Sequence, residues 1–129
     1  MKSLMVFVLS LVVLTSCQSQ PPYTDNGNPG QIKAIIFYDD NRNRVLDSNE
    51  IGAETELGIS QDISCPPSRD EAITPILADI NGEVLFQDLK PGKYCIHPMG
   101  NFGMTTKQNQ EVYVSSDQTT TVLFGIVKD

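Results

Sequence analysis

The chain has 129 residues, a length that suits one small domain. Its 16 acidic and 9 basic residues give a formal net charge of −7. An acidic surface repels phosphate backbones and anionic lipid headgroups, so the composition argues against nucleic acid as a partner and against electrostatic binding to a membrane.

The first sixteen residues, "MKSLMVFVLSLVVLTS", have the order of a secretory signal: one Lys, an unbroken apolar stretch and then small residues. The apolar run is about half as long as a membrane-spanning helix requires. The following "LTSC" at 14–17 resembles the bacterial lipobox. That resemblance implies cleavage before Cys17 and lipidation of its thiol, and two or three acyl chains hold a protein stably on a bilayer. The alternative is an ordinary signal peptide with a chance Cys.

These features predict a simple organisation. Residues 1–16 are expected to be the lipoprotein signal peptide, and residues 17–30 the lipidated Cys with a flexible tether. The tether is almost entirely Gln, Ser, Pro, Asn, Asp and Gly, which cannot form a core. Residues 31–127 form the folded domain. We expect it to lie at the cell membrane or outer membrane, facing the periplasm or the exterior.

Short strands separated by turns recur through the folded part. The segment 31–38, "QIKAIIFY", is rich in Ile and aromatic residues, and 57–65 alternates apolar with polar residues. The segment 74–89 holds a short apolar piece, an Asn-Gly turn and another alternating run.

The remaining segments follow the same pattern. A Pro-Gly turn precedes an expected strand that ends near residue 98, and 110–127 reads as a strand pair around the turn 115–118. No window of eleven or more residues after the signal has apolar residues at helical spacing. The sequence therefore predicts an all-β domain, a small antiparallel β-sandwich.

The polar segment 39–50, "DDNRNRVLDSNE", directly follows the first expected strand. Its oxygen-bearing side chains have the spacing of a twelve-residue calcium loop that ends in a bidentate Glu. The candidate ligands are Asp39, Asn41, Asn43, the carbonyl of Val45, Asp47 and Glu50. The alternative is a polar turn, since Asp and Asn bond their own backbone readily.

One place in this loop departs from the pattern. Arg44 stands where the pattern has Gly, and a side chain costs about 1 kcal/mol in the unusual backbone conformation needed there. Arg42 and Arg44 also bring two positive charges near the carboxylates, which weakens cation binding. Leu46 is expected to face the core.

Two cysteines remain once Cys17 carries the lipid. In an oxidising compartment such a spare pair tends to be bridged, which predicts a disulfide between Cys65 and Cys95. Alternation does not clearly place both side chains on one face, so two buried free thiols are the alternative.

A second motif adds to the reading of the loop. The segment 79–94, "DINGEVLFQDLKPGKY", has Asp79 and Gly82 in a tight turn and apolar residues at alternating places up to Tyr94. It resembles the repeated pattern of SdrD B-like domains, which are related to Cna B-type and transthyretin-like (prealbumin-like) modules. Those domains begin with a strand that runs into a calcium loop, the place that 39–50 occupies here.

The resemblance covers residues 31–127. It implies an immunoglobulin-like or prealbumin-like sandwich, and Ca²⁺ at the loop from Asp39 to Glu50. Some relatives carry an intramolecular Lys–Asn isopeptide bond, for which Lys33 could be the first member. The last expected strand has no Asn, so we do not expect that bond.

Nothing in the sequence points to an enzyme. His97 is the sole His and stands at the end of an expected strand, and there is no Cys-x-x-Cys pair, phosphate loop or nucleophile elbow. We expect a non-catalytic, lipid-anchored envelope module with a structural or protein-binding role, whose partner is an envelope or surface protein. The alternative is a carbohydrate- or peptide-binding module of an extracellular degradation system. It would use loops 66–75 and 98–109, with Tyr23, Phe102 and Tyr113 as its aromatic residues.

Overall fold

The computed structural model describes residues 23–61, 64–68 and 72–128. The expected signal peptide and Cys17 lie outside these residues, so both stay predictions. Within the described part the secondary structure is entirely strand and turn, and none of it is a helix suited to crossing a bilayer.

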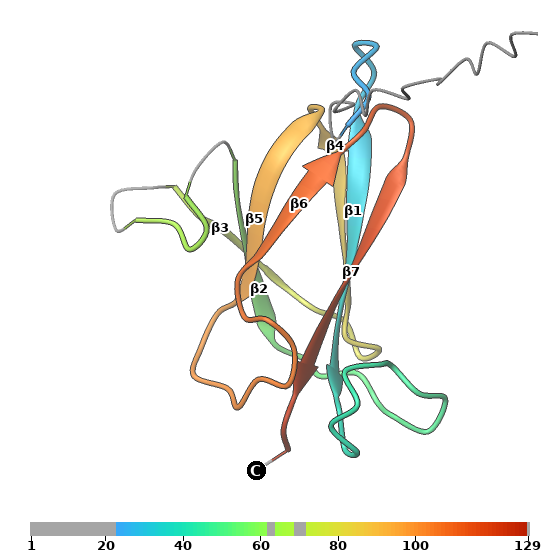
Figure 1. Ribbon diagram of the computed structural model, residues 1–129, viewed down its shortest axis with the longest axis vertical. Coiled ribbons are helices and arrows are strands. Elements are labelled where there is room, and N and C mark those ends of the chain that lie inside the picture. Colours follow the sequence, from blue (N-terminus) through green and yellow to red (C-terminus); the bar gives the residue numbers. More distant parts are fainter. Residues whose placement is uncertain (1–22, 62–63, 69–71, 129) are drawn as a thin grey trace, which may run out of the picture.

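Seven strands form two sheets (Figure 1). The strands are β1 (Gly30–Tyr38), β2 (Glu56–Gln61), β3 (Thr74–Leu77), β4 (Glu83–Leu89), β5 (Gly92–Pro98), β6 (Gln110–Val114) and β7 (Thr119–Ile126). One sheet has the order β4-β1-β7 and the other the order β3-β2-β5-β6. The predicted all-β sandwich is confirmed.

The pairing of the last two strands differs from the expected one. The turn at 115–118 is present, but β6 and β7 belong to different sheets, so their expected pairing is wrong. Instead β7 crosses over and pairs with β1, and this pairing is parallel from Gln31–Thr119 to Tyr38–Ile126. The reason is that the alternation of apolar and polar residues shows which face of a strand is buried. It does not show which other strand pairs with it.

A single apolar core lies between the sheets. Ile32, Ala34 and Ile36 of β1 are fully buried, and the same cluster includes Phe124 of β7 and Ile96 of β5. Alternate residues of β1 and of β4 to β7 therefore supply the core, as the period of two requires, whereas all four residues of β3 are exposed.

The motif at 79–94 has the structure expected of it. The Asp79 carboxylate accepts hydrogen bonds from the N–H groups of Asn81 and Glu83, both at 2.9 Å, and Gly82 has a φ of 72°. The Ile36 N–H donates to the Gly82 carbonyl at 2.8 Å. Further along, buried Tyr94 donates its hydroxyl hydrogen to the Lys90 carbonyl at 2.7 Å. The turn thus sits at the far end of β1, beside the candidate metal loop.

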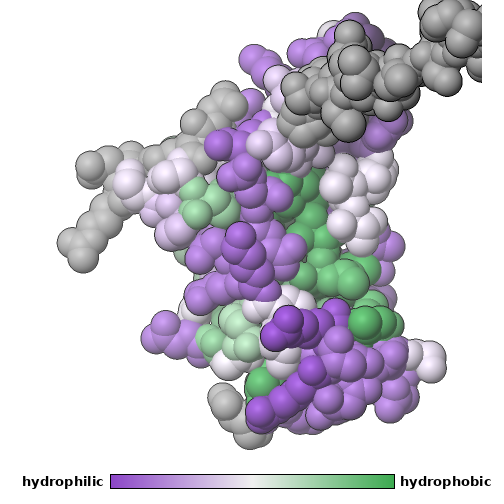
Figure 2. Space-filling view, viewed as in Figure 1, coloured by the Kyte–Doolittle hydropathy of each residue, from purple (hydrophilic) through white to green (hydrophobic). Residues whose placement is uncertain are grey.

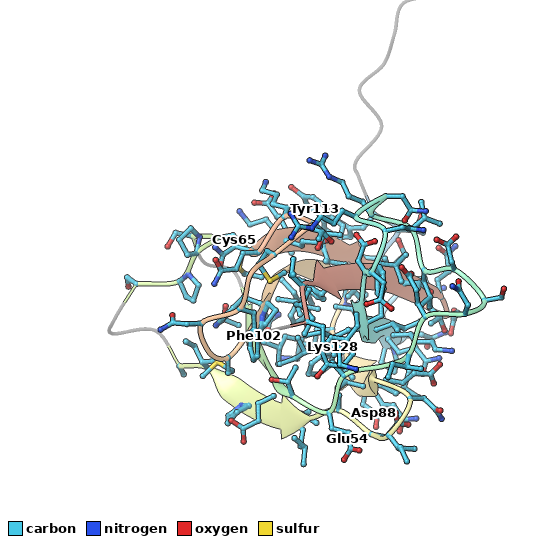
Figure 3. All side chains as sticks on the ribbon, turned by 90° about the horizontal axis from the view of Figure 1, so that it is seen from below. Glu54, Cys65, Asp88, Phe102, Tyr113 and Lys128 are labelled. Atoms are coloured by element: carbon cyan, nitrogen blue, oxygen red, sulfur yellow. A yellow bond between two sulfur atoms is a disulfide. The ribbon has the colours of Figure 1, made fainter. Side chains whose placement is uncertain are left out.

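The predicted disulfide is confirmed. Cys65 and Cys95 are joined with a Cα–Cα distance of 5.4 Å, and Figure 3 shows the bond beside the label of Cys65. Cys95 lies on the outer face of its sheet, opposite Ser60. The bridge therefore fastens the segment that follows β2 onto β5.

The expected flexible tether does not extend up to residue 30. Residues 24–28 are hydrogen-bonded to the turn between β6 and β7. Asn and Ser form few apolar contacts, but their side chains can saturate the main-chain groups of a neighbouring turn. The described end of the expected tether therefore contacts the domain through polar groups, without apolar packing of its own.

Candidate metal site

The loop 39–50 starts from a buried carboxylate at the end of β1. Asp39 is 1% exposed, and its N–H donates to the Ile126 carbonyl of β7 at 2.9 Å. Its Oδ1 accepts the N–H of Asn43 at 3.1 Å, and its Oδ2 accepts the N–H of Arg44 at 2.9 Å. Asp39 therefore shapes the first half of the loop around its own side chain.

The pKa of Asp39 reflects two opposing effects. Burial disfavours the charged form and raises the pKa, but neighbouring donors outweigh it, and the pKa lies below its usual value. The donors are the Thr105 side chain, which lies beside the carboxylate without the full geometry of a hydrogen bond, and the main-chain N–H groups of residues 42–44. Asp39 is thus an anion that its surroundings stabilise.

Sequence reasoning did not find Thr105. Its segment runs along the outer edge of β7, where the Thr105 N–H donates to the Gly125 carbonyl at 2.9 Å. A β-carbon at Gly125 would overlap the Thr105 hydroxyl oxygen and lie 3.2 Å from Cβ of Asp39. The only sequence signal was therefore a Gly inside the apolar second half of β7, which marks a close approach.

The second half of the loop is held by its own polar side chains. Oδ2 of Asp47 accepts hydrogen bonds from the amide groups of Asn41 at 2.7 Å and Asn43 at 2.8 Å. Glu50 closes the neck, because its two oxygens accept the N–H groups of Asp40 and Asp47, both at 3.0 Å. The loop is closed on itself in this form.

The structure brings together some of the predicted ligands. Asn41, Asn43 and Asp47 meet directly, whereas the carboxylates stay apart: across the described residues no three His, Cys, Asp or Glu side chains gather as a metal site. Val45 has a 54% exposed side chain. Leu46 is half-buried and outside the core cluster, so its expected core position is wrong.

The donor set nevertheless suits a hard cation. All six predicted ligands offer oxygen, which Ca²⁺ prefers. The Oδ1 atoms of Asn41 and Asn43 already accept main-chain N–H groups within the loop, but a carbonyl oxygen has two lone pairs and retains capacity for an ion. A cation at Asp47 would take the place of the two amide hydrogen bonds.

The backbone of the loop has the unusual conformation expected at the missing Gly. Arg44 has a φ of 67° and Arg42 a φ of 56°, both in the left-handed region that non-Gly residues avoid. The expected strain at Arg44 is therefore present.

We expect Arg44→Gly to stabilise the domain by about 1 kcal/mol, because Gly adopts this φ without the steric cost of a β-carbon. Chemical denaturation measures the change. Arg44→Ala is the matched control, since it removes the same charge and keeps the strain. Equal stability of the two variants would show that charge, and not backbone conformation, matters at this place.

The residues considered for catalysis and for sugar binding lie apart. His97 is half-buried on β5, and burial lowers its pKa, so its ring is neutral at physiological pH. Phe102 packs against the core (Figure 3), and Tyr23 stacks on Tyr113 with ring centroids 6.1 Å apart. The three aromatic residues are therefore engaged within the domain rather than gathered in one surface.

An open groove of about 590 Å³ lies between β6 and β7, the adjacent edge strands of the two sheets. Figure 2 shows apolar surface between the two strands, flanked by polar side chains. Its charged lining residues are Arg44, Lys107 and Glu111, and it contains neither His nor Cys. Within the lining the Tyr113 hydroxyl donates to Oε1 of Glu111 at 2.9 Å.

The fold is similar to that of bacterial pilin subunits. GBS52, the minor pilin of Streptococcus agalactiae, matches with a TM-score of 0.51 and 13% identity, over 79% of this chain and 45% of that one. BcpA, the major pilin subunit of Bacillus cereus, matches with a TM-score of 0.52 and 16% identity, over 79% and 31%. The major pilin SpaD of Corynebacterium diphtheriae gives 0.53 and 10%, over 83% and 34%.

These matches support the Cna B-type or prealbumin-like sandwich expected from the sequence. At such low identities they show the fold alone, and the chain spans less than half the length of each of these pilins. No protein-family model matches the sequence, and no curated protein is significantly similar to it.

Proposed function

We propose that the protein is a non-catalytic module of the cell envelope, lipid-anchored at Cys17 and stabilised by Ca²⁺ in the loop 39–50. Its role is structural or protein-binding. The observation that carries the proposal is the loop itself, which wraps oxygen-bearing side chains around a short stretch of chain. The fold shared with pilin subunits supports a structural role.

In this proposal some residues of the loop hold its shape and others bind the ion. Asp39 and Glu50 hold the two ends of the loop through main-chain hydrogen bonds. The ion would be bound by side-chain oxygens of Asn41, Asn43 and Asp47, which lie near one another. For this the two Asn side chains would give up their hydrogen bonds to Asp47 and direct their carbonyl oxygens at the ion. The ion would link the end of β1 to the segment before β2, and so tie the two sheets together.

Exposed aliphatic side chains near the loop favour a protein partner. Val45 is 54%, Ile51 58% and Ile80 76% exposed. A β-carbon at Gly52 would overlap the main chain of Asn81, so Ile51 and Ile80 belong to touching segments. Adjacent exposed apolar residues are typical of protein–protein contacts. We propose an envelope or surface protein as the partner.

Calcium is expected to raise the melting temperature of the full-length protein in detergent. At a free Ca²⁺ concentration ten times the dissociation constant, binding adds about 1.4 kcal/mol. For a domain of this size that corresponds to a rise of roughly 5–10 °C. Calorimetry in 10 mM Ca²⁺ and in excess chelator measures it.

The control is Glu50→Gln, which keeps one of the two acceptor oxygens at the neck of the loop and removes one negative charge from the ligand set. We expect the calcium-dependent rise to be largely lost in this variant. Identical melting of the parent protein in calcium and in chelator would contradict the calcium part of the proposal and leave the fold assignment untouched.

A further inference from the structure

The segment 23–29 is bound to one end of the sandwich, and we call it the N-terminal latch. Thr24 both donates its N–H to the Ser115 hydroxyl at 3.1 Å and accepts the N–H of Ser116 at 2.8 Å. The N–H of Asn26 donates to the Ser116 hydroxyl at 3.0 Å. The latch therefore pairs with the turn between β6 and β7 along its main chain.

A single carboxylate reinforces this pairing. Oδ2 of Asp117 accepts hydrogen bonds from the side-chain amides of Asn26 at 3.0 Å and Asn28 at 3.1 Å. The main-chain N–H of Asp117 donates to the Pro29 carbonyl oxygen at 3.0 Å. These two amide hydrogen bonds hold the pKa of Asp117 below its usual value. The carboxylate is thus specifically solvated by the latch.

An aromatic contact fixes the start of the latch. The ring of Tyr23 stacks on that of Tyr113, with centroids 6.1 Å apart and planes at 14°. Such pairs contribute about 0.5–1.5 kcal/mol beyond the burial of their surface. The latch is therefore held both at the turn and on β6.

We propose that the latch sets the orientation of the domain on the membrane, with the turn between β6 and β7 toward the lipid and the loop 39–50 away from it. The proposal rests on the lipid anchor at Cys17. From Cys17 to Tyr23 the chain reaches at most about 21 Å, whereas a free tether up to Gly30 would reach about 45 Å. The latch thus reduces the maximum distance between the lipid anchor and the domain by more than half.

The shape of the domain places the loop at the other end. β1 begins beside the latch at Gly30 and ends at Tyr38, and its nine residues span about 26 Å. In Figure 1 the turn between β6 and β7 and the start of β1 lie at the top, and the loop after β1 lies at the bottom. Gly52 touches Asn81, so the exposed Ile51 and Ile80 lie in touching segments that follow or adjoin this loop, and in this orientation they face away from the lipid.

Charge keeps the latched end from lying on the lipid. Asp25 and Asp117 are both exposed there, and anionic headgroups repel them. The repulsion falls off over a Debye length of about 8 Å at physiological ionic strength. The repulsion therefore acts only when the latched end comes within about this distance of the headgroups.

Energy transfer from Trp to dansyl-labelled lipid tests the orientation, because the natural chain has no Trp. Gln118→Trp reports on the latched end and Ser48→Trp on the loop end, and both positions are exposed. Each full-length lipidated variant is reconstituted on phosphatidylcholine vesicles that carry the probe. We expect transfer from position 118 to exceed that from position 48 at least about threefold.

Adding Tyr23→Ala and Asp117→Gly to both reporters should bring the two transfer efficiencies close together. Gly suits the φ of 59° at 117 and removes the carboxylate together with its β-carbon. We also expect hydrogen exchange at residues 24–28 to be slowed in the parent protein and at least tenfold faster in this variant.

Vesicle-bound parent protein with equal transfer from both ends would overturn the orientation and leave the anchor intact. Protein that remains in the supernatant would overturn the anchor, and the orientation with it. Unprotected amides at 24–28 in the parent protein would overturn the latch itself.

Discussion

Gly82→Ala is expected to destabilise the domain by about 2–5 kcal/mol. Two effects lower the free energy of unfolding. A residue with a β-carbon loses about 1–2 kcal/mol at the left-handed φ of 72°, and extra volume in a packed site costs about 1–3 kcal/mol more. The new β-carbon would overlap the Ile36 carbonyl oxygen and lie 2.9 Å from the Ala53 nitrogen. Relief requires the turn 79–82 to separate from β1 or from the segment before β2.

Two other glycines separate these costs. Gly27 has a φ of 90° with open space around it, so Gly27→Ala tests conformation without a clash. Gly103 has ordinary contacts at 3.5 Å and no left-handed φ, so Gly103→Ala should change stability little. Denaturant unfolding of the three variants gives the comparison. A cost for Gly82→Ala no greater than that for Gly27→Ala would show that the turn yields easily.

Local patterns predicted the strands well because most strands bury alternate residues against one core, although β3 is exposed throughout. The run 31–38 and the turn at Asn81–Gly82 were found in this way, and both are present within a residue or two of their expected places. The motif ending at Tyr94 predicted buried positions correctly, since it encodes a turn and a face rather than a distant contact.

Contacts between distant parts of the chain could not be predicted in the same way. The crossing of β7 to the other sheet depends on which edge is free, and alternation carries no such information. The latch depends on Asn26 and Asn28 meeting Asp117, about 90 residues later. Polar side chains of this kind have no periodicity that marks their partners.

The candidate site shows the same division. The spacing of the polar residues predicted a compact loop, and the strain at Arg44 followed from the absence of Gly. The burial of Asp39 depends instead on Thr105 and β7, which lie far away in the sequence. Asp47 accepts the amide groups of Asn41 and Asn43, and an ion would compete for the same carboxylate, a competition that residue spacing does not decide.

Removal of the disulfide is the second change with a large expected effect. The bridge closes a loop with a sequence separation of 30 residues, and its loss frees chain entropy in the unfolded state worth roughly 3.5 kcal/mol. Small domains have about 5–15 kcal/mol of stability in total, so this is a large share. We expect Cys65→Ala with Cys95→Ala to lower the melting temperature by roughly 15 °C or more.

The fold itself should survive this change, because β2 and β5 are paired from Leu57–Pro98 to Gln61–Tyr94 independently of the sulfur atoms. Ile73, Met99 and His97 meet over Gly58 on the outer face of that strand pair, and the disulfide holds the chain after β2 against β5. Without the disulfide, we expect water to reach this face and His97 more easily. Burial now lowers the pKa of His97, so we expect that pKa to rise toward its usual value in the double variant, as measured by NMR titration.

The matched control is the parent protein with reductant, which should follow the variant in both melting and titration. Equal melting temperatures of the oxidised parent and the double variant would show that packing of the two sheets alone determines the stability of this domain.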